Sequence, residues 1–272
     1  MTTDSPAPEP APADEADVDI TVPHSARIWN YWLGGTDNYP VDRAAGDQYR
    51  EVYPEIVDVA RASRAFQARA VRYLAAEAGL RQFLDIGAGL PAAGNTHEVA
   101  QAIAPQSRVL YVDHDPFVVR HGGRRLTSTP EGAAGYIEAD LHQPEEILAA
   151  AEGWLDFGQP IALLLMGVMG HLDDADAYRV VAGLIAGLPP GSYFALQDGA
   201  LTSDEFGEAQ QGYDDTGAIP YRLRRPAQIA AFFDGLDLVP PGVVQVPQWR
   251  PDPGPPGLSP DVGSFGGVAR KP

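Results

Sequence analysis

The sequence contains no cysteine, which excludes disulfide bonds and thiolate metal sites. It also lacks a run of about 18 apolar residues, the length that indicates a membrane-spanning helix. The acidic N-terminus, rich in Pro and Ala, has no basic region followed by an apolar stretch, so it is not a secretory signal. From these absences we expect a cytoplasmic protein with no bound metal and no membrane partner.

Lysine is almost absent, because Lys271 is the only one in the chain. The other basic side chains are arginines, and the formal net charge is −18. A chain this acidic repels the phosphates of nucleic acids unless its few cations cluster. We therefore expect no nucleic-acid partner and favour a small or neutral substrate, although the charge can also serve only to keep the protein soluble.

The pattern of residues changes twice along the chain. Residues 1–20 hold six acids, four prolines and no cation, which predicts a disordered acidic tail. Residues 81–272 alternate apolar strand patterns with helical ones, which predicts an α/β fold with a doubly wound, mostly parallel sheet. Between them, residues 21–80 carry helical patterns, roughly over 26–33, 41–53 and 54–78.

Five strands are predicted in the alternating part, with helices between them. The fourth, 160–166, is an unbroken apolar run and is expected to lie in the centre of the sheet, buried on both faces. Further along, the pattern predicts a helix near 226–233 and short strands near Leu238 and 267–269, and the Pro- and Gly-rich residues 251–262 are expected to be irregular. The five strands are 82–86, 108–113, 135–139, 160–166 and 192–197.

A glycine pair, Gly87 and Gly89, follows the first predicted strand. Ligands of doubly wound sheets bind at the carboxyl ends of the strands, and glycine lets the backbone approach them closely. Because residue 92 is Ala, the spacing also meets the relaxed dinucleotide pattern. Asp113 ends the second strand, where an acid can accept both ribose hydroxyls of either NAD or S-adenosylmethionine (SAM). The spacing alone therefore leaves both ligands open.

Asp85, two residues before Gly87, separates the two ligands. A carboxylate there would repel the pyrophosphate of a dinucleotide. SAM has no phosphate and carries a sulfonium and an α-ammonium group, which a carboxylate favours. These features favour SAM over NAD, while the alternative is that Asp85 only binds backbone amides of the loop.

The ends of the third and fourth strands complete the predicted constellation. Asp140 can accept the adenine amino group while Leu141 packs on the ring, although Asp140 can also cap the helix that begins near Pro144. Met166 ends the fourth strand and is followed by a short segment that contains His171. This end of the sheet is expected to face the reactive part of the ligand.

Four segments carry a more specific pattern. They are Gln82 to Ala100, Ala26 to Tyr39 with Asp42-Arg43, Val109 to Pro116, and the C-terminal Phe232 to Leu236 with Gly266 to Pro272. Together they resemble the actinobacterial type of SAM-dependent methyltransferase, an S-adenosyl methyltransferase family formerly listed as a domain of unknown function. The resemblance covers roughly residues 22–272.

The resemblance implies the Rossmann-like class I methyltransferase fold, with a seven-stranded sheet and one antiparallel edge strand. It implies that residues 21–80 form an N-terminal helical cap over the cofactor pocket and that residues 81–272 form the SAM-binding domain. It further places four residues of the cap near the methionine end of SAM, although the same residues can be a helix stop and a polar turn. These four are Tyr31, Gly34, Asp37 and Asn38, and Asn95 and Asp115 from the matching segments join the predicted cofactor set.

The chain departs from the family pattern in two places. Beside the reacting methyl group it has His171-Leu172 in place of a His followed by an aromatic residue. In the helix before the first strand it has Ser63 to Phe66, where the family usually has Asn-Arg-x-Phe. We predict a methyltransferase for a small-molecule acceptor, with secondary metabolism as one setting and His171 as candidate general base. Two alternatives stay open: a SAM-using enzyme that cyclises the aminobutyryl arm and releases methylthioadenosine, and a non-catalytic protein that binds SAM or a nucleoside. A homodimer also stays open.

Overall fold

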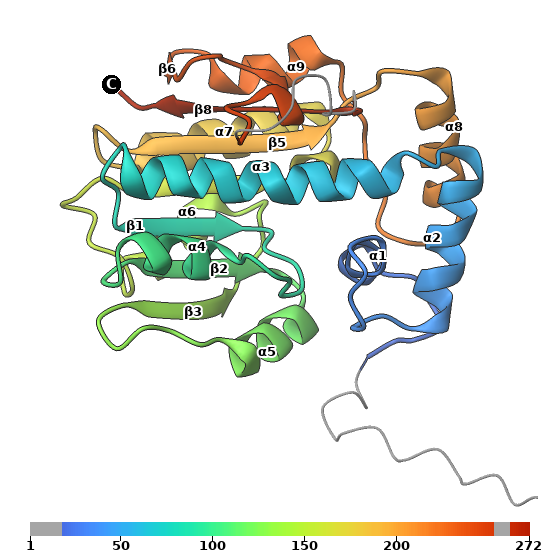
Figure 1. Ribbon diagram of the computed structural model, residues 1–272, viewed down its shortest axis with the longest axis horizontal. Helices are drawn as coiled ribbons and strands as arrows, with labels where there is room; N and C mark the ends of the chain where they lie inside the picture. Colours follow the sequence, from blue (N-terminus) through green and yellow to red (C-terminus); the bar gives the residue numbers. More distant parts are fainter. Residues whose placement is uncertain (1–17, 253–261) are drawn as a thin grey trace, which may run out of the picture.

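One mixed sheet forms the centre of the computed structural model, which describes residues 18–252 and 262–272 (Figure 1). Its strands lie in the order β3-β2-β1-β4-β5-β8-β6, and the short β7 pairs with β8 outside this order. The bounds are β1 Gln82–Ile86, β2 Arg108–Asp113, β3 Ala133–Glu138, β4 Ala162–Met166, β5 Tyr193–Gly199, β6 Asp237–Leu238, β7 Val244–Gln245 and β8 Ser264–Arg270.

This topology confirms the predicted doubly wound, mostly parallel sheet. Strands β1 to β5 are parallel to one another, and β8 runs antiparallel to β5. The antiparallel strand is second from the edge, because the two-residue β6 pairs with its outer side. Residues 1–17 of the predicted tail and residues 253–261 of the predicted irregular segment lie outside the described residues.

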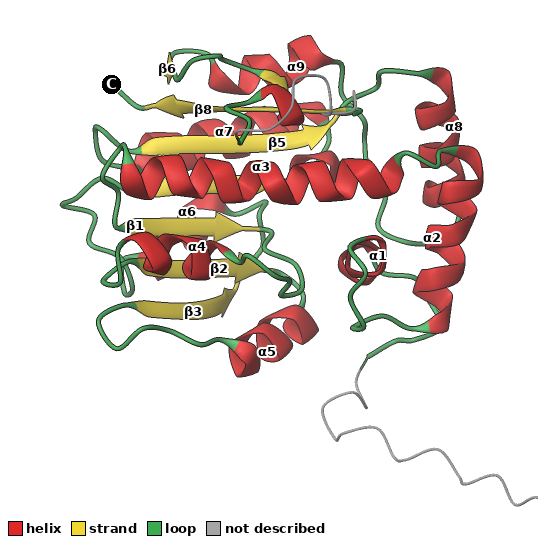
Figure 2. Ribbon diagram, in the orientation of Figure 1, coloured by secondary structure: helices red, strands yellow, loops and turns green. Residues whose placement is uncertain are grey.

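Helices cover both faces of the sheet and its carboxyl end (Figure 2). Within the described residues, no helix is both long enough and apolar enough to cross a membrane. The helices are α1 Ser25–Trp32, α2 Pro40–Val52, α3 Ile56–Ala76, α4 Thr96–Ile103, α5 Pro116–Arg125, α6 Pro144–Ala151, α7 Asp174–Gly187, α8 Asp204–Asp214 and α9 Pro226–Ala230, with the 3₁₀ turns η1 Met169–His171, η2 Ala231–Phe233 and η3 Val246–Gln248.

Alternate side chains of the strands enter two separate cores, as the two-residue period of a strand requires. On β1, Phe83 packs on the side of α3, whereas Leu84 and Ile86 pack on the opposite side with α6 and α7. The central strand β4 has its residues Ala162 to Leu165 fully buried, which confirms the prediction from its unbroken apolar run. The sheet is therefore a rigid base for the loops at its carboxyl end.

The cap over that end is built from α1, α2 and α8, which stand beyond the arrowheads of the parallel strands in Figure 1. Helix α8 packs along α2 although the two are far apart in sequence. The long helix α3 begins at the cap and runs across one face of the sheet (Figure 1). Residues beyond 200 thus belong to a cap that the family resemblance assigned to residues 21–80 alone.

A buried ion pair ties α1 to α2 inside this cap. The carboxylate of Asp42 is fully buried and accepts hydrogen bonds from Arg27 Nε at 2.9 Å and from the backbone N–H groups of His24 and Tyr39 at 2.9 and 2.8 Å. Arg27 also donates to the carbonyl of Val22 at 2.7 Å. Three donors of the cap therefore depend on one carboxylate.

The substitution Asp42→Ala is expected to lower the free energy of unfolding by about 3–5 kcal/mol, because it leaves the Arg27 guanidinium buried without its partner. Urea denaturation followed by circular dichroism measures this loss. The control Asp58→Ala removes the partner of Arg61 in an exposed ion pair, so the free energy of unfolding should fall by less than about 1 kcal/mol. Equal losses in the two variants would contradict the role given to Asp42.

Candidate functional site

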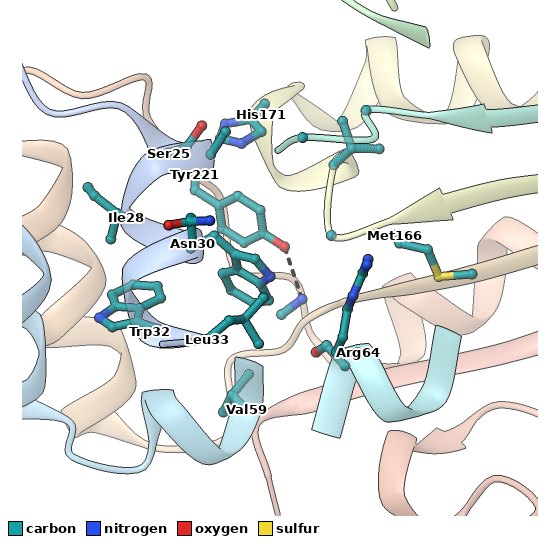
Figure 3. A pocket seen from close by; sticks show the side chains of 18 of the residues that line it. Ser25, Ile28, Asn30, Trp32, Leu33, Val59, Arg64, Met166, His171 and Tyr221 are labelled. Carbon is teal, nitrogen blue, oxygen red and sulfur yellow. Dashed lines mark hydrogen bonds between the residues drawn. The ribbon is translucent and has the colours of Figure 1, made fainter. Parts of the chain in front are cut away.

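A cavity of about 200 Å³ lies between α1 and the carboxyl ends of β1, β4 and β5 (Figure 3). Its wall includes side chains and backbone from the cap, from α3 and from the loops that follow the parallel strands. Six predicted site residues line it together: Asp85, Gly87, Gly89, Asp113, Met166 and His171. The other eight do not line it: Tyr31, Gly34, Asp37, Asn38, Asn95, Asp115, Asp140 and Leu141.

The glycine loop after β1 needs both of its glycines. Gly87 and Gly89 have φ angles of 71° and 62°, in the left-handed region that favours glycine. A Cβ atom at Gly87 would lie 2.4 Å from Cγ2 of Val168, in the loop after β4. The loop backbone is therefore open to a ligand on one side and closely packed on the other.

Asp85 lies near the end of β1 and is 2 % exposed. Its Oδ2 accepts hydrogen bonds from Thr96 Oγ1 at 2.6 Å and from Gln67 Nε2 at 3.2 Å. Burial raises the pKa of this carboxyl to about 6, although the two hydrogen bonds and the Arg64 guanidinium act in the opposite direction. Among the described residues both of these partners are side chains that bind Oδ2, and no backbone amide of the glycine loop binds Asp85, so its other oxygen can face a cation in the cavity.

Arg64 reaches the same cavity from α3, and it is not among the residues predicted from the sequence. Its guanidinium donates to Gln67 Oε1 at 2.7 Å and to Asn95 Oδ1 at 2.8 Å. Its Nε is buried without a hydrogen-bond partner among the described residues. One feature of the sequence could have pointed to Arg64. It lies in Ser63 to Phe66, one of the segments where the chain departs from the family pattern. Asn95 itself holds Arg64 and does not line the cavity.

Asp113 ends β2 and supports the glycine loop directly. Its Oδ2 accepts a hydrogen bond from the Gly89 N–H at 2.9 Å, and its Oδ1 accepts one from the Asp115 N–H at 3.0 Å. A carboxylate has further acceptor capacity on both oxygens, so ribose hydroxyls can bind as well. Asp115 caps α5 through Phe117 N–H at 2.8 Å and pairs with His24 Nε2 at 3.1 Å, which joins the cap to the sheet.

The four predicted residues of the cap hold its structure together and lie outside the cavity lining. Gly34 ends α1 at a φ of 81°, and Tyr31 donates to Asp47 at 2.8 Å. Asp37 pairs with Arg125 of α5 at 2.5 Å. The Asn38 side chain donates to Asn30 Oδ1 and to the Gly35 carbonyl, both at 2.9 Å. Their contact with a cofactor stays a prediction.

The predicted adenine contacts lie at the end of β3. Asp140 is half exposed and accepts hydrogen bonds from the backbone and ring of His142, whereas Leu141 packs at the edge of the core. Those bonds hold the pKa of Asp140 below its usual range. Neither residue lines the enclosed cavity, so an adenine there would occupy the open end of the site.

His171 lies in η1, where its ring packs edge-on against Tyr221 with ring centroids 5.1 Å apart. Its Nδ1 lies 3.0 Å from the Pro220 carbonyl oxygen, so Nδ1 carries the proton of the neutral ring and Nε2 is left as an acceptor. Burial holds the pKa of the imidazole below its usual range. At neutral pH His171 is therefore an uncharged base beside the cavity.

The buried pair of Tyr221 and Asp198 was not predicted from the sequence. Tyr221 extends into the space between α1 and Met166 (Figure 3), and its hydroxyl donates to Asp198 Oδ1 and accepts from the Gly199 N–H at 3.0 Å. Asp198 is fully buried at the end of β5, and burial raises its pKa to about 7, although Arg224 lies within 3.6 Å. Nothing in the spacing of these residues signals their contact before folding.

Comparisons with known proteins agree with this geometry. A family profile described as S-adenosyl methyltransferase matches residues 11–272. The chain is similar to the solved structure of a DUF574 family protein from Streptomyces avermitilis, at 44 % identity and a TM-score of 0.88, over 93 % of this chain and 99 % of that one. Nothing matches among the curated proteins searched.

Two other solved structures extend the likeness. A proposed methyltransferase from Thermobifida fusca shares 37 % identity at a TM-score of 0.85, over 93 % of this chain and 96 % of that one. A SAM-dependent methyltransferase from Anabaena variabilis is only 14 % identical at a TM-score of 0.51, over 92 % of this chain and 97 % of that one, so it shows the fold alone. Together they confirm the predicted Rossmann-like methyltransferase fold with N-terminal helices.

The residues of the cavity fit SAM chemically. The unpartnered Nε of Arg64 suits a carboxylate, and the buried Asp85 suits an ammonium or sulfonium group. Gly87 packs too closely on Val168 to carry a side chain, and its backbone lines the cavity. Asp113 at the next strand end offers acceptors for a ribose. The four groups are complementary to the methionine and ribose parts of one SAM molecule.

The substitution Asp113→Ala is expected to weaken SAM binding by roughly 1–3 kcal/mol, because it removes charge-assisted hydrogen bonds to the ribose. Titration calorimetry with SAM measures the change, and Asp113→Asn tests how much of it comes from the charge. The control Asp176→Ala removes an exposed carboxylate on α7 and should leave the affinity unchanged. Unchanged affinity in Asp113→Ala would refute the ribose assignment.

Proposed function

From the premise that this chain belongs to the S-adenosyl methyltransferase family and uses SAM, we propose that it methylates a small-molecule acceptor. The observation that supports this proposal most is the division of the cavity. Of the residues that suit SAM, Asp85 and Asp113 lie at the strand ends and Arg64 reaches them from α3, and the space under α1 stays open beside them (Figure 3). Secondary metabolism is the proposed setting, and the cytoplasm the proposed location.

In this proposal SAM supplies a methyl group on a positively charged sulfur, and the protein aligns the acceptor with it and excludes water. Asp85 and Arg64 hold the charged amino-acid end, and the glycine loop and Asp113 hold the ribose. Met166 and the loop after β4 border the reacting end. His171 receives the proton that a protonated acceptor loses as it gains the methyl group.

Incubation with SAM tests the reaction type. We expect S-adenosylhomocysteine to form only when an acceptor is added, as measured by liquid chromatography of the nucleoside products. Methylthioadenosine released from SAM alone would instead show cyclisation of the aminobutyryl arm. Tight SAM binding with no turnover over a broad acceptor panel would show a binding protein, and either of these two results would overturn the proposal.

The substitution His171→Phe is expected to lower kcat by about 10²–10⁴-fold for an acceptor that must lose a proton, with SAM affinity unchanged. Because the pKa of His171 lies below its usual range, the wild-type rate should stay constant at neutral pH and fall only in more acidic buffer, where the ring gains a proton. Discontinuous rate assays over a series of pH values measure both effects. If His171→Phe kept the wild-type rate and pH profile, another group would be the base.

A further inference from the structure

The half of the cavity under the cap has an aromatic wall. Trp32 packs edge-on against Tyr49 with ring centroids 5.2 Å apart, and Tyr49 in turn packs against Phe206 and Tyr213 at 6.5 and 6.2 Å. These rings come from α1, α2 and α8, so the wall forms only when the cap is assembled. The apolar residues of the wall are Ile28, Trp29, Trp32, Leu33, Tyr49, Ile56, Val59, Phe206 and Tyr213.

Charged side chains are confined to the other half. Within the described lining, the carboxylates and guanidinium are Asp85, Asp113 and Arg64. Asp85 binds Thr96 at the start of α4, Asp113 binds the glycine loop, and Arg64 binds Asn95, just before α4. A charged acceptor under the cap would lose its hydration without meeting an opposite charge, which is costly. The net charge of −18 adds a general repulsion of anions.

Two polar groups line the cavity at the end of β5. They are Gln197 of the strand itself and Tyr221, which follows α8 and whose hydroxyl binds Asp198 and Gly199. The Tyr221 hydroxyl donates its proton to Asp198 and accepts from Gly199 N–H, so it offers a ligand only an acceptor lone pair. The Gln197 Oε1 accepts from the hydroxyls of Ser63 at 3.2 Å and Ser264 at 2.7 Å, which leaves its amide nitrogen as a donor. A hydroxyl group is both donor and acceptor and therefore matches this pair.

We propose that the acceptor is an uncharged, flat, apolar molecule with a hydroxyl group, whose body packs on the aromatic wall and whose hydroxyl binds Tyr221 and Gln197. This inference rests on the proposed function, because it places the acceptor beside the SAM residues. Gln210 takes no part, since its side chain already binds Tyr49 and Asp214. His171 packs edge-on against the ring of Tyr221 and lines the same cavity.

The first test compares three compounds that share one ring system and differ in charge: 2-naphthol, 2-naphthoate and 2-naphthylmethylammonium. Binding is measured by tryptophan fluorescence with S-adenosylhomocysteine present. We expect 2-naphthol to bind at least about tenfold more tightly than either charged compound. Equal or tighter binding of a charged compound would overturn the inference, whereas a protein that binds no S-adenosylhomocysteine would overturn the proposed function instead.

A gain of binding tests the location. Leu33 lies just after α1 and faces the cavity in Figure 3, and it is partly exposed, so a longer side chain can be accommodated. Leu33→Arg should tighten 2-naphthoate binding at least about tenfold by supplying a cation. Leu33→Met, of similar size but uncharged, should not. If Leu33→Arg left 2-naphthoate binding unchanged while S-adenosylhomocysteine still bound, the naphthyl group would not occupy this wall.

The polar pair is tested by comparing 2-naphthol with 2-methoxynaphthalene, which cannot donate a hydrogen bond. We expect the wild type to prefer 2-naphthol by about fivefold to tenfold and Tyr221→Phe to lose that preference. Gln197→Met is a second variant that leaves the Tyr221–Asp198 bond in place, and it should reduce the affinity for 2-naphthol. Retained preference in Tyr221→Phe, with S-adenosylhomocysteine still bound, would contradict recognition of the hydroxyl by this residue.

Discussion

The buried carboxylate of Asp85 is the constraint around which the site is arranged. An ionised group at 2 % exposure is costly unless it has partners, and here the partners come from two other elements: Gln67 of α3 and Thr96 of α4. Because burial raises its pKa, the carboxylate lowers the stability of the empty protein as the pH rises from its ordinary pKa to about 6. A cation in the cavity reverses that penalty, which links folding to cofactor binding.

The cap follows from the same arrangement, since α3 both supplies Gln67 and Arg64 and leads back to α2. Contacts of α1 and its following loop then close the cap on α5, through His24 with Asp115 and Asp37 with Arg125. The closed cap divides one cavity into a half with charged groups and a half with aromatic ones. Cofactor and acceptor are therefore separated by chemistry as well as by position.

The sequence predicted the sheet well because strand patterns are local: the unbroken apolar run of β4 and the short buried run of β1 each carry their own signal. It also predicted that Asp85, Asp113 and Met166 would meet, since the ends of parallel strands share one edge. Arg64 and the Tyr221–Asp198 pair were missed because their contacts depend on how distant segments pack. The cap residue Asp37, predicted from resemblance, pairs with Arg125, and its contact with SAM stays a prediction.

Calorimetric titration of SAM at about pH 6, in buffers of different ionisation enthalpy, tests the role of Asp85 most directly. About half of the Asp85 carboxyls hold a proton at that pH, and a bound cation lowers the pKa and expels it. We predict proton release on SAM binding in the wild type, an affinity that rises with pH through this range, and neither effect in Asp85→Asn. Equal proton release in the two proteins would contradict the account.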